Sequence, residues 1–276
     1  FAGAVNAGLK ASSGDFISII DSDDWLEDNT IQILHDKLNN SDLDMTIYCA
    51  RTFDEKIQKF TDDIVFTFPE IPETYNNSYF QFKDVKDYIL HYPTQAWNKF
   101  YRRSFLIDNN NFIDEELGSA GADALFTFYN YVNAQKIGIV RDKLYNYRVN
   151  VGLGVVATLR TKTCENFMFN FKLFDKINKL IIDKKLPPEI ALPFAKVNLQ
   201  QLIYFFRMIH PHNKPQYYKK LRECLCSLPT DIYTEDLYKS LKTFEIMDYD
   251  DLIKIQHSRT YRIYQLKNFI SPAIFY

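Results

Sequence analysis

Apolar runs of strand length and apolar stripes of helical spacing alternate along the first 154 residues. Residues 17–20 form a β-branched apolar run, which is typical of a short buried strand. Residues 44–51 alternate apolar and polar side chains as a strand does, and residues 26–38 have the spacing of a helix. The apolar positions of that helix are Ile31, Leu34 and Leu38. Alternating strands and helices predict an α/β fold.

The pattern continues with a possible hairpin over residues 60–68 and a short helix over 83–91. A helix after residue 123 and a strand over 137–140 follow. From residue 161 onward only amphipathic helical stripes remain, and we expect them to pack as a helical core rather than to bind a ligand. The segments are 167–181, 187–206, 217–226, 234–244 and 249–257. We therefore predict two domains, an α/β domain over 1–154 and a helical C-terminal region over 155–276.

Composition indicates a globular protein and excludes few functions. Hydrophobic residues make up 46% of the 276 residues and charged residues 25%. A net charge of −2 gives no reason to expect a nucleic-acid partner. The four cysteines form neither a dense disulfide framework nor a CxxC metal pair, and no apolar run is long enough to span a bilayer. We expect reduced thiols and a cytoplasmic location, and the sequence indicates no oligomeric state.

Three acidic residues follow the first predicted strand, at Asp21, Asp23 and Asp24. Burying three like charges together is costly unless a cation or solvent compensates them, so we expect an exposed turn at the end of the strand. Asp21 and Asp23 can both turn toward one hard divalent cation, which prefers carboxylate oxygens. The alternative is an acidic turn in which Asp24 caps the next helix.

Read with its flanks, this turn resembles the DxD motif of the family 2 glycosyltransferases. Residues 6–17 supply an Asn-x-Gly helix, a small-residue turn and an apolar strand, and residues 21–26 supply Asp-Ser-Asp-Asp-Trp-Leu. Val5 departs from the Arg that the family often has before the Asn. The resemblance implies a GT-A-like (Rossmann-like) mixed sheet and a nucleotide-sugar donor bound at Asp21, Ser22 and Asp23. It also implies Mn²⁺ or Mg²⁺, held by Asp23 and by Asp21, which faces either the metal or the ribose.

Two later segments resemble other parts of the same family. Residues 97–102 resemble its Trp-x-Lys segment, and residues 144–148 resemble its Leu-Tyr-x-Tyr-Arg segment, which a loop over 149–154 follows. The resemblance places Lys99 and Arg148 at the donor diphosphate, whose charge they would offset. It places Trp97 and Asp24 at the acceptor, where the Trp ring would stack on a sugar. The alternative is a core aromatic residue beside solvated cations.

Asp123 matches the Asp that serves as catalytic base in this family, at the head of a helix. Here Ala122 replaces the Glu that usually precedes that Asp. Inverting transfer needs one carboxylate to take the proton of the acceptor hydroxyl, so Asp123 alone suffices. The alternative is that Asp123 only caps its helix.

The resemblance also suggests that the sheet lacks its first β-α units, because the chain starts within the Asn-x-Gly helix. We expect an inverting glycosyltransferase that moves a sugar from a nucleotide-sugar donor, with a UDP-sugar expected, to a glycan or lipid-linked acceptor in bacterial surface polysaccharide synthesis. Residues 261–270 mix basic and aromatic side chains, which suggests a peripheral contact with the inner face of the plasma membrane. The alternatives are a non-catalytic binding or scaffold module and a nucleotidyltransferase.

Overall fold

A computed structural model describes most of the chain. The described residues are 1–39, 41–61, 67–68, 71–89, 95–117, 121–149 and 168–226. The chain divides into two compact units, Phe1–Gly154 and Val155–Tyr276. Each unit is described by itself below.

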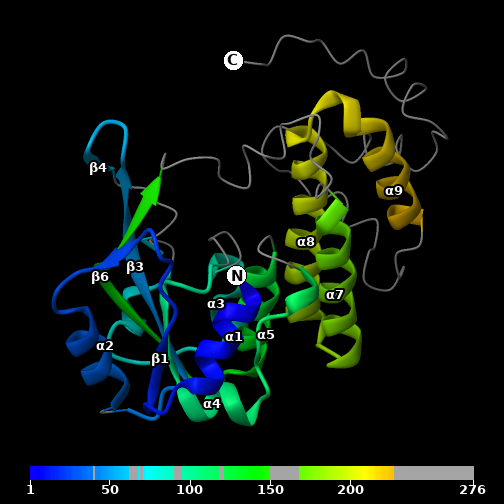
Figure 1. The fold of residues 1–276 in the computed structure, drawn as a ribbon. Helices are drawn as coiled ribbons and strands as arrows, with labels where there is room; N and C mark the ends of the chain where they lie inside the picture. Colours follow the sequence, from blue (N-terminus) through cyan, green and yellow to red (C-terminus); the bar gives the residue numbers. More distant parts are fainter. Residues whose placement is uncertain are drawn as a thin grey trace. The chain divides into compact units, whose positions relative to one another are not determined.

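The described part of the first unit contains a six-stranded mixed sheet, which confirms the predicted class of fold (Figure 1). Its strands are β1 (Phe16–Ser18), β2 (Trp25–Leu26), β3 (Met45–Asp54), β4 (Lys59–Thr61), β5 (Lys99–Arg102) and β6 (Ile137–Val149). Their order is β1-β5-β3-β6-β2, and β4 pairs with β3. Strands β3 and β6 run parallel, whereas the other pairs are antiparallel. The two longest strands therefore lie side by side in the middle of the sheet and end near each other.

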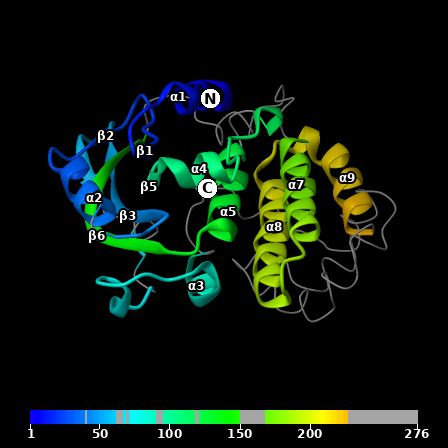
Figure 2. The same ribbon diagram turned by 90° about the horizontal axis from the view of Figure 1, so that it is seen from below.

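Helices cover both faces of this sheet (Figure 2). The helices of this unit are α1 (Ala2–Ala11), α2 (Thr30–Asn39), α3 (Phe82–Ile89), α4 (Arg103–Asp108) and α5 (Ala122–Asn133). Single 3₁₀ turns occur at Glu73–Tyr75 and Glu115–Leu117. Helix α2 lies on one side of the sheet, and α4 and α5 lie on the other. Helix α3 confirms the helix predicted over 83–91, within the residues that the structure describes.

The first six residues of β3 are all buried, although apolar and polar residue types alternate along the strand. Burial on both sides follows because helices cover both faces of the sheet. Tyr48 and Ala50 join the core cluster with Leu34 and Leu38 of α2. On the neighbouring strand β5, the Tyr101 ring meets the Phe126 ring of α5 edge to face. The predicted strand over 44–51 is thus present and extends to Asp54.

Three details of the predicted elements are wrong. Strand β1 ends at Ser18, so the side chain of Ile20 is 46% exposed. The second helix begins at Thr30 rather than near residue 26, because Trp25 and Leu26 pair with β6 as strand β2. The hydroxyl of Thr30 donates a hydrogen bond to the Leu144 carbonyl, which fixes that start against β6. With this register Ile31 is 52% exposed, and only Leu34 and Leu38 face the core. Of the predicted hairpin, β4 is described, whereas residues 62–66 lie outside the described residues.

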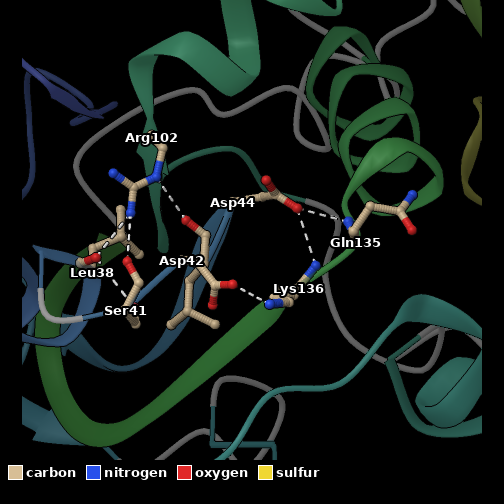
Figure 3. A network of polar contacts seen from close by, with 8 residues as sticks. Leu38, Ser41, Asp42, Asp44, Arg102, Gln135 and Lys136 are labelled. Carbon is tan, nitrogen blue, oxygen red and sulfur yellow. Dashed lines mark hydrogen bonds and ion pairs between the residues drawn. The ribbon is translucent and has the colours of Figure 1, made fainter.

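A polar network ties together the end of the sheet at which β3 and β6 begin (Figure 3). The Arg102 guanidinium donates to the backbone carbonyls of Leu38, Ser41 and Leu43, at 2.9 to 3.0 Å. The Asp44 carboxylate accepts from the backbone N–H groups of Gln135 and Lys136, at 2.7 and 3.0 Å. These side chains join the turns that enter the two central strands, at the end of the sheet away from the acidic turn.

The described part of the second unit is helical, as predicted. It contains α7 (Phe169–Asp183), α8 (Pro188–Met208) and α9 (Lys214–Cys226), with a 3₁₀ turn at Pro211–Asn213. The Tyr217 ring of α9 packs on Phe171 of α7, and its hydroxyl donates to the Leu202 carbonyl of α8 at 2.9 Å. Within the described ranges, no helix has the length and apolarity needed to cross a membrane. The predicted helices over 234–257 and the segment 261–270 lie outside the described residues.

The Arg102 network gives a first prediction. Replacing Arg102 by Lys should lower the free energy of unfolding by roughly 1–3 kcal/mol, because one ammonium cannot reproduce a fork that serves three carbonyls. Arg103→Lys is the matched control, since the Arg103 side chain donates to a single carbonyl, that of Ser12. Urea unfolding of both variants should show the larger loss at Arg102. Equal losses would contradict this account of the network.

Candidate functional site

The acidic turn follows β1 after two further residues, Ile19 and Ile20, and its own backbone closes it. The N–H of Asp24 donates to the Asp21 carbonyl at 3.2 Å. Ser22 and Asp23 are exposed, whereas Asp21 and Asp24 are partly buried. The turn therefore exposes the two middle residues of Asp-Ser-Asp-Asp and keeps the carboxyl groups at its two ends partly buried.

Strand β6 holds this turn in place. The Tyr145 hydroxyl donates to one Asp24 carboxylate oxygen at 2.7 Å and accepts the N–H of Asp21 at 3.2 Å. The other Asp24 oxygen accepts the backbone N–H of Arg148 at 2.7 Å. Asp24 thus fastens the turn to β6, and the alternative that it caps the next helix is wrong, since α2 begins only at Thr30. Its predicted acceptor contact stays a prediction, and both of its oxygens already accept protein hydrogen bonds.

The carboxyl groups of the turn are held close against their mutual repulsion. Burial, together with the charges of Asp24 and Asp23, raises the pKa of Asp21 from 3.8 to about 6. Burial also raises the pKa of Asp24, which the hydrogen bonds from Arg148 and Tyr145 oppose. A bound cation would relieve this repulsion, so the donor set of Asp21 and Asp23 fits a hard divalent ion. Among the described residues, no three His, Cys, Asp or Glu side chains gather as metal ligands.

Asp123 lies in the first turn of α5, whose N-cap is Gly121 at φ 89°. Only glycine adopts such a backbone conformation readily, so Gly121 sets the direction in which the helix starts. The Asp123 Oδ1 is buried and has no hydrogen-bond partner among the residues that the structure describes. A buried carboxylate oxygen without a partner is costly, which does not suit a residue that only caps a helix.

The charge of Asp123 is coupled to the acidic turn. Burial raises the pKa of Asp123 from 3.8 to about 7, and the charge of Asp21 acts in the same direction. The Lys99 ammonium and the Ala96 N–H lower that pKa. The fold therefore brings together three of the predicted site residues, Asp21, Lys99 and Asp123, from separate parts of the chain.

Lys99 is fully buried, which its sequence pattern did not indicate. Its ammonium donates to the Gln95 carbonyl and, at 2.6 Å, to the Asn98 side-chain oxygen. Burial lowers the pKa of Lys99 from 10.5 to about 7, and the charge of Asp123 opposes this change. Its contact with a donor diphosphate stays a prediction, and the contacts described here are to the protein itself.

Trp97 is a core residue in this structure, as the alternative interpretation held. Its side chain is 2% exposed and stacks on Tyr145 with ring centroids 4.3 Å apart. Tyr147 stacks on it at 5.4 Å. The predicted stacking on an acceptor sugar stays a prediction, and it would require this aromatic stack to rearrange.

Arg148 lies beside the acidic turn, but much of its hydrogen-bonding capacity is used. Its Nε donates to the Asp23 carbonyl at 2.8 Å, and Nη1 donates to Glu55 at 3.0 Å. Its guanidinium also lies over the Trp25 ring, 4.9 Å from the centroid. Most of the predicted loop over 149–154 lies outside the described residues, as residues 150–154 are not described.

Sequence reasoning missed the functions of Tyr145 and Asn6, although both lie in the motifs that it used. Tyr145 bridges two residues of the acidic turn, as described above. The Asn6 side chain of α1 donates to the Ile113 carbonyl at 2.8 Å and accepts the Ile113 N–H at 2.9 Å. This paired contact fixes the segment that precedes α5. The presence of both residues in family-like motifs was the available signal.

The sequence of this chain is similar to those of known glycosyltransferases. Residues 1–109 match the family described as Glycosyl transferase family 2. EpsH of Bacillus subtilis is 33% identical over 154 residues, which are 54% of this chain and 42% of EpsH. The poly(ribitol-phosphate) beta-N-acetylglucosaminyltransferase TarS of Staphylococcus aureus is 29% identical over 144 residues, 51% of this chain and 22% of TarS. The chain thus spans less than half the length of these relatives.

The fold is also found in solved structures. The crystal structure of S. aureus TarS 1–349 in complex with UDP superposes with a TM-score of 0.58 at 19% identity, covering 94% of this chain and 70% of that one. The structure of the same protein with UDP-GlcNAc gives the same values. This likeness shows a GT-A fold. Residues 1–109, less than half of the chain, are thus similar to glycosyl transferase family 2.

Proposed function

We propose that this chain forms the catalytic part of an inverting glycosyltransferase with a UDP-linked sugar donor. The match to family 2 supports the reaction class, and the titles of the TarS structures, which name UDP and UDP-GlcNAc, support the donor class.

One observation supports the proposal best. The buried, unpartnered Oδ1 of Asp123 lies close enough to the Asp21 turn for their charges to interact. Asp123 would take the proton of the acceptor hydroxyl as its oxygen attacks the anomeric carbon. A base with a pKa of about 7 suits this role, because about half of it is ionised at neutral pH and it accepts a proton readily. A single displacement by one attacking oxygen inverts the anomeric configuration.

The donor would lie at the acidic turn. Asp23 and Asp21 would hold Mn²⁺ or Mg²⁺, and Ser22 would lie beside the nucleotide. Such an ion supplies positive charge to the leaving diphosphate, so no protein acid is needed on that side. Arg148 contacts the turn through the Asp23 carbonyl and would add a further cation near the same charge.

The acceptor and the location in the cell are further parts of the proposal. We infer a glycan or lipid-linked acceptor in bacterial surface polysaccharide synthesis, which the name of TarS supports. A cytoplasmic enzyme with peripheral contact to the membrane through residues 261–270 would suit such an acceptor. A non-catalytic binding module is the alternative, and the two experiments below distinguish it.

Asp123→Asn should lower kcat by about 10²- to 10⁴-fold while leaving the KM of the donor nearly unchanged, because only the proton acceptor is removed. The measurement is steady-state release of UDP in the presence of an acceptor. Asp108→Asn is the matched control, since Asp108 is exposed at the end of α4. Turnover of Asp123→Asn within about threefold of the original rate would rule out its role as base.

UDP should bind to the chain in the presence of Mn²⁺, and EDTA should abolish the binding. Asp23→Ala should weaken UDP at least roughly tenfold, because it removes a carboxylate ligand of the cation. Asp28→Ala, an exposed Asp just beyond the turn, is the control. Calorimetric titration measures all four cases. UDP binding that ignores both EDTA and Asp23→Ala would argue against a metal-dependent donor site.

A further inference from the structure

Residues 95–98 form a turn that leads into β5, and the neighbouring strand holds its backbone. The Tyr48 hydroxyl of β3 donates to the Trp97 carbonyl at 2.7 Å. The N–H of the same Tyr48 donates to the Asn98 carbonyl at 3.1 Å. Trp97 itself is buried among the aromatic side chains of β6. This turn is therefore fixed to the centre of the sheet.

The Gln95 carbonyl at the start of this turn is shared by two elements. The buried ammonium of Lys99, the first residue of β5, donates to it. The Thr127 hydroxyl donates to the same oxygen at 3.3 Å. Thr127 lies on α5 one helical turn beyond Asp123. A single carbonyl oxygen thus joins the start of β5 to the helix that presents Asp123.

The next residue of the turn, Ala96, lies near the carboxylate, since its backbone N–H lowers the pKa of Asp123. Lys99 is tied to both ends of the turn, at Gln95 and at the Asn98 side chain. We propose that Lys99 is a positioning residue for the catalytic base. It ties the turn at Gln95 to the helix that carries Asp123, and in its charged form it stabilises the ionised carboxylate. This inference rests on the proposed function, in which Asp123 is that base.

The charged and titratable groups around Asp123 come from three elements. The Asp21 turn adds a negative charge, and β5 adds Lys99 and the Tyr101 phenol. Tyr131 of α5 lies near Lys99, whose ammonium is 5.9 Å from the ring centroid. Burial holds the pKa of both phenols above the usual range, so they stay neutral at physiological pH. Within the described residues, Lys99 is thus the positive charge that acts on Asp123.

Burial also distinguishes this role from donor binding. A fully buried ammonium that already donates to two protein oxygens would have to break those contacts to reach a diphosphate. Positioning of Asp123 therefore predicts that changes at Lys99 alter the rate and its pH dependence, and leave the affinity for the donor unchanged. Donor binding predicts the opposite.

The first test is kinetic. Lys99→Met keeps the length of the side chain and removes the charge. We expect kcat at pH 7 to fall about tenfold and the acidic limb of kcat/KM to move up by about one pH unit, with the KM of the donor within about twofold. The limb moves upward because the charge of Lys99 lowers the pKa of Asp123. Lys99→Arg keeps the charge and should leave the limb in place. Lys59→Met, on the exposed strand β4, is the control.

The second test needs no activity and is run in EDTA. It compares the melting temperature of the chain with that of Asp123→Asn from pH 4 to pH 9. The folded-state pKa of Asp123 is raised, so the carboxylate costs no stability below its unfolded pKa and costs progressively more as pH rises. The melting temperature of Asp123→Asn should therefore exceed that of the original chain by a difference that grows with pH and levels off near pH 7. In a Lys99→Met background the difference should level off about one unit higher.

These tests separate the inference from the proposed function. The difference in melting temperature that Asp123→Asn causes could level off at the same pH with and without Lys99. That result would overturn the inference and leave the proposed function intact. A rise in the KM of the donor with an unmoved pH limb would do the same and would return Lys99 to the donor site. Full turnover by Asp123→Asn would overturn the proposed function, and the positioning role with it.

Discussion

Mutual repulsion among three carboxyl groups in one four-residue turn is the constraint around which the first unit is arranged. The turn's own backbone hydrogen bond is not enough to hold it, because Asp21 and Asp24 must stay partly buried against their neighbours' charge. Strand β6 supplies what the turn lacks, through the Tyr145 hydroxyl and the Arg148 backbone N–H. Because β6 is paired in parallel with β3 in the middle of the sheet, the position of the turn follows that of the central strands.

The position of Asp123, the other part of the site, also depends on strand β3. Strand β3 fixes the turn at 95–98, and Thr127 of α5, the helix that carries Asp123, donates a hydrogen bond to that turn. Two acidic groups far apart in the sequence thus come within electrostatic reach at one end of the sheet. The polar network around Arg102 lies at the other end, where the strands begin. The Arg102 network that stabilises the fold and the acidic groups proposed for catalysis therefore lie at opposite ends of the same sheet.

The sequence predicted the features that residue type and spacing determine. It predicted less well which side chains are buried. The acidic turn and the helix headed by Asp123 could be predicted because their chemistry is local. The burial of Lys99 and Trp97 could not, since only the packing of β5 and β6 determines which polar and aromatic side chains are enclosed. Ile31 became exposed for a similar reason, because pairing of Trp25 with β6 delayed the start of α2.

The central claim is that one carboxylate, that of Asp123, serves as base for a single displacement. The anomeric configuration of the product tests this claim most directly. Proton NMR of the glycoside formed from a UDP-sugar should show the configuration opposite to that of the donor, and the signal should disappear in Asp123→Asn. A product that keeps the configuration of the donor would contradict the account, because retention requires a second displacement or a different arrangement of groups.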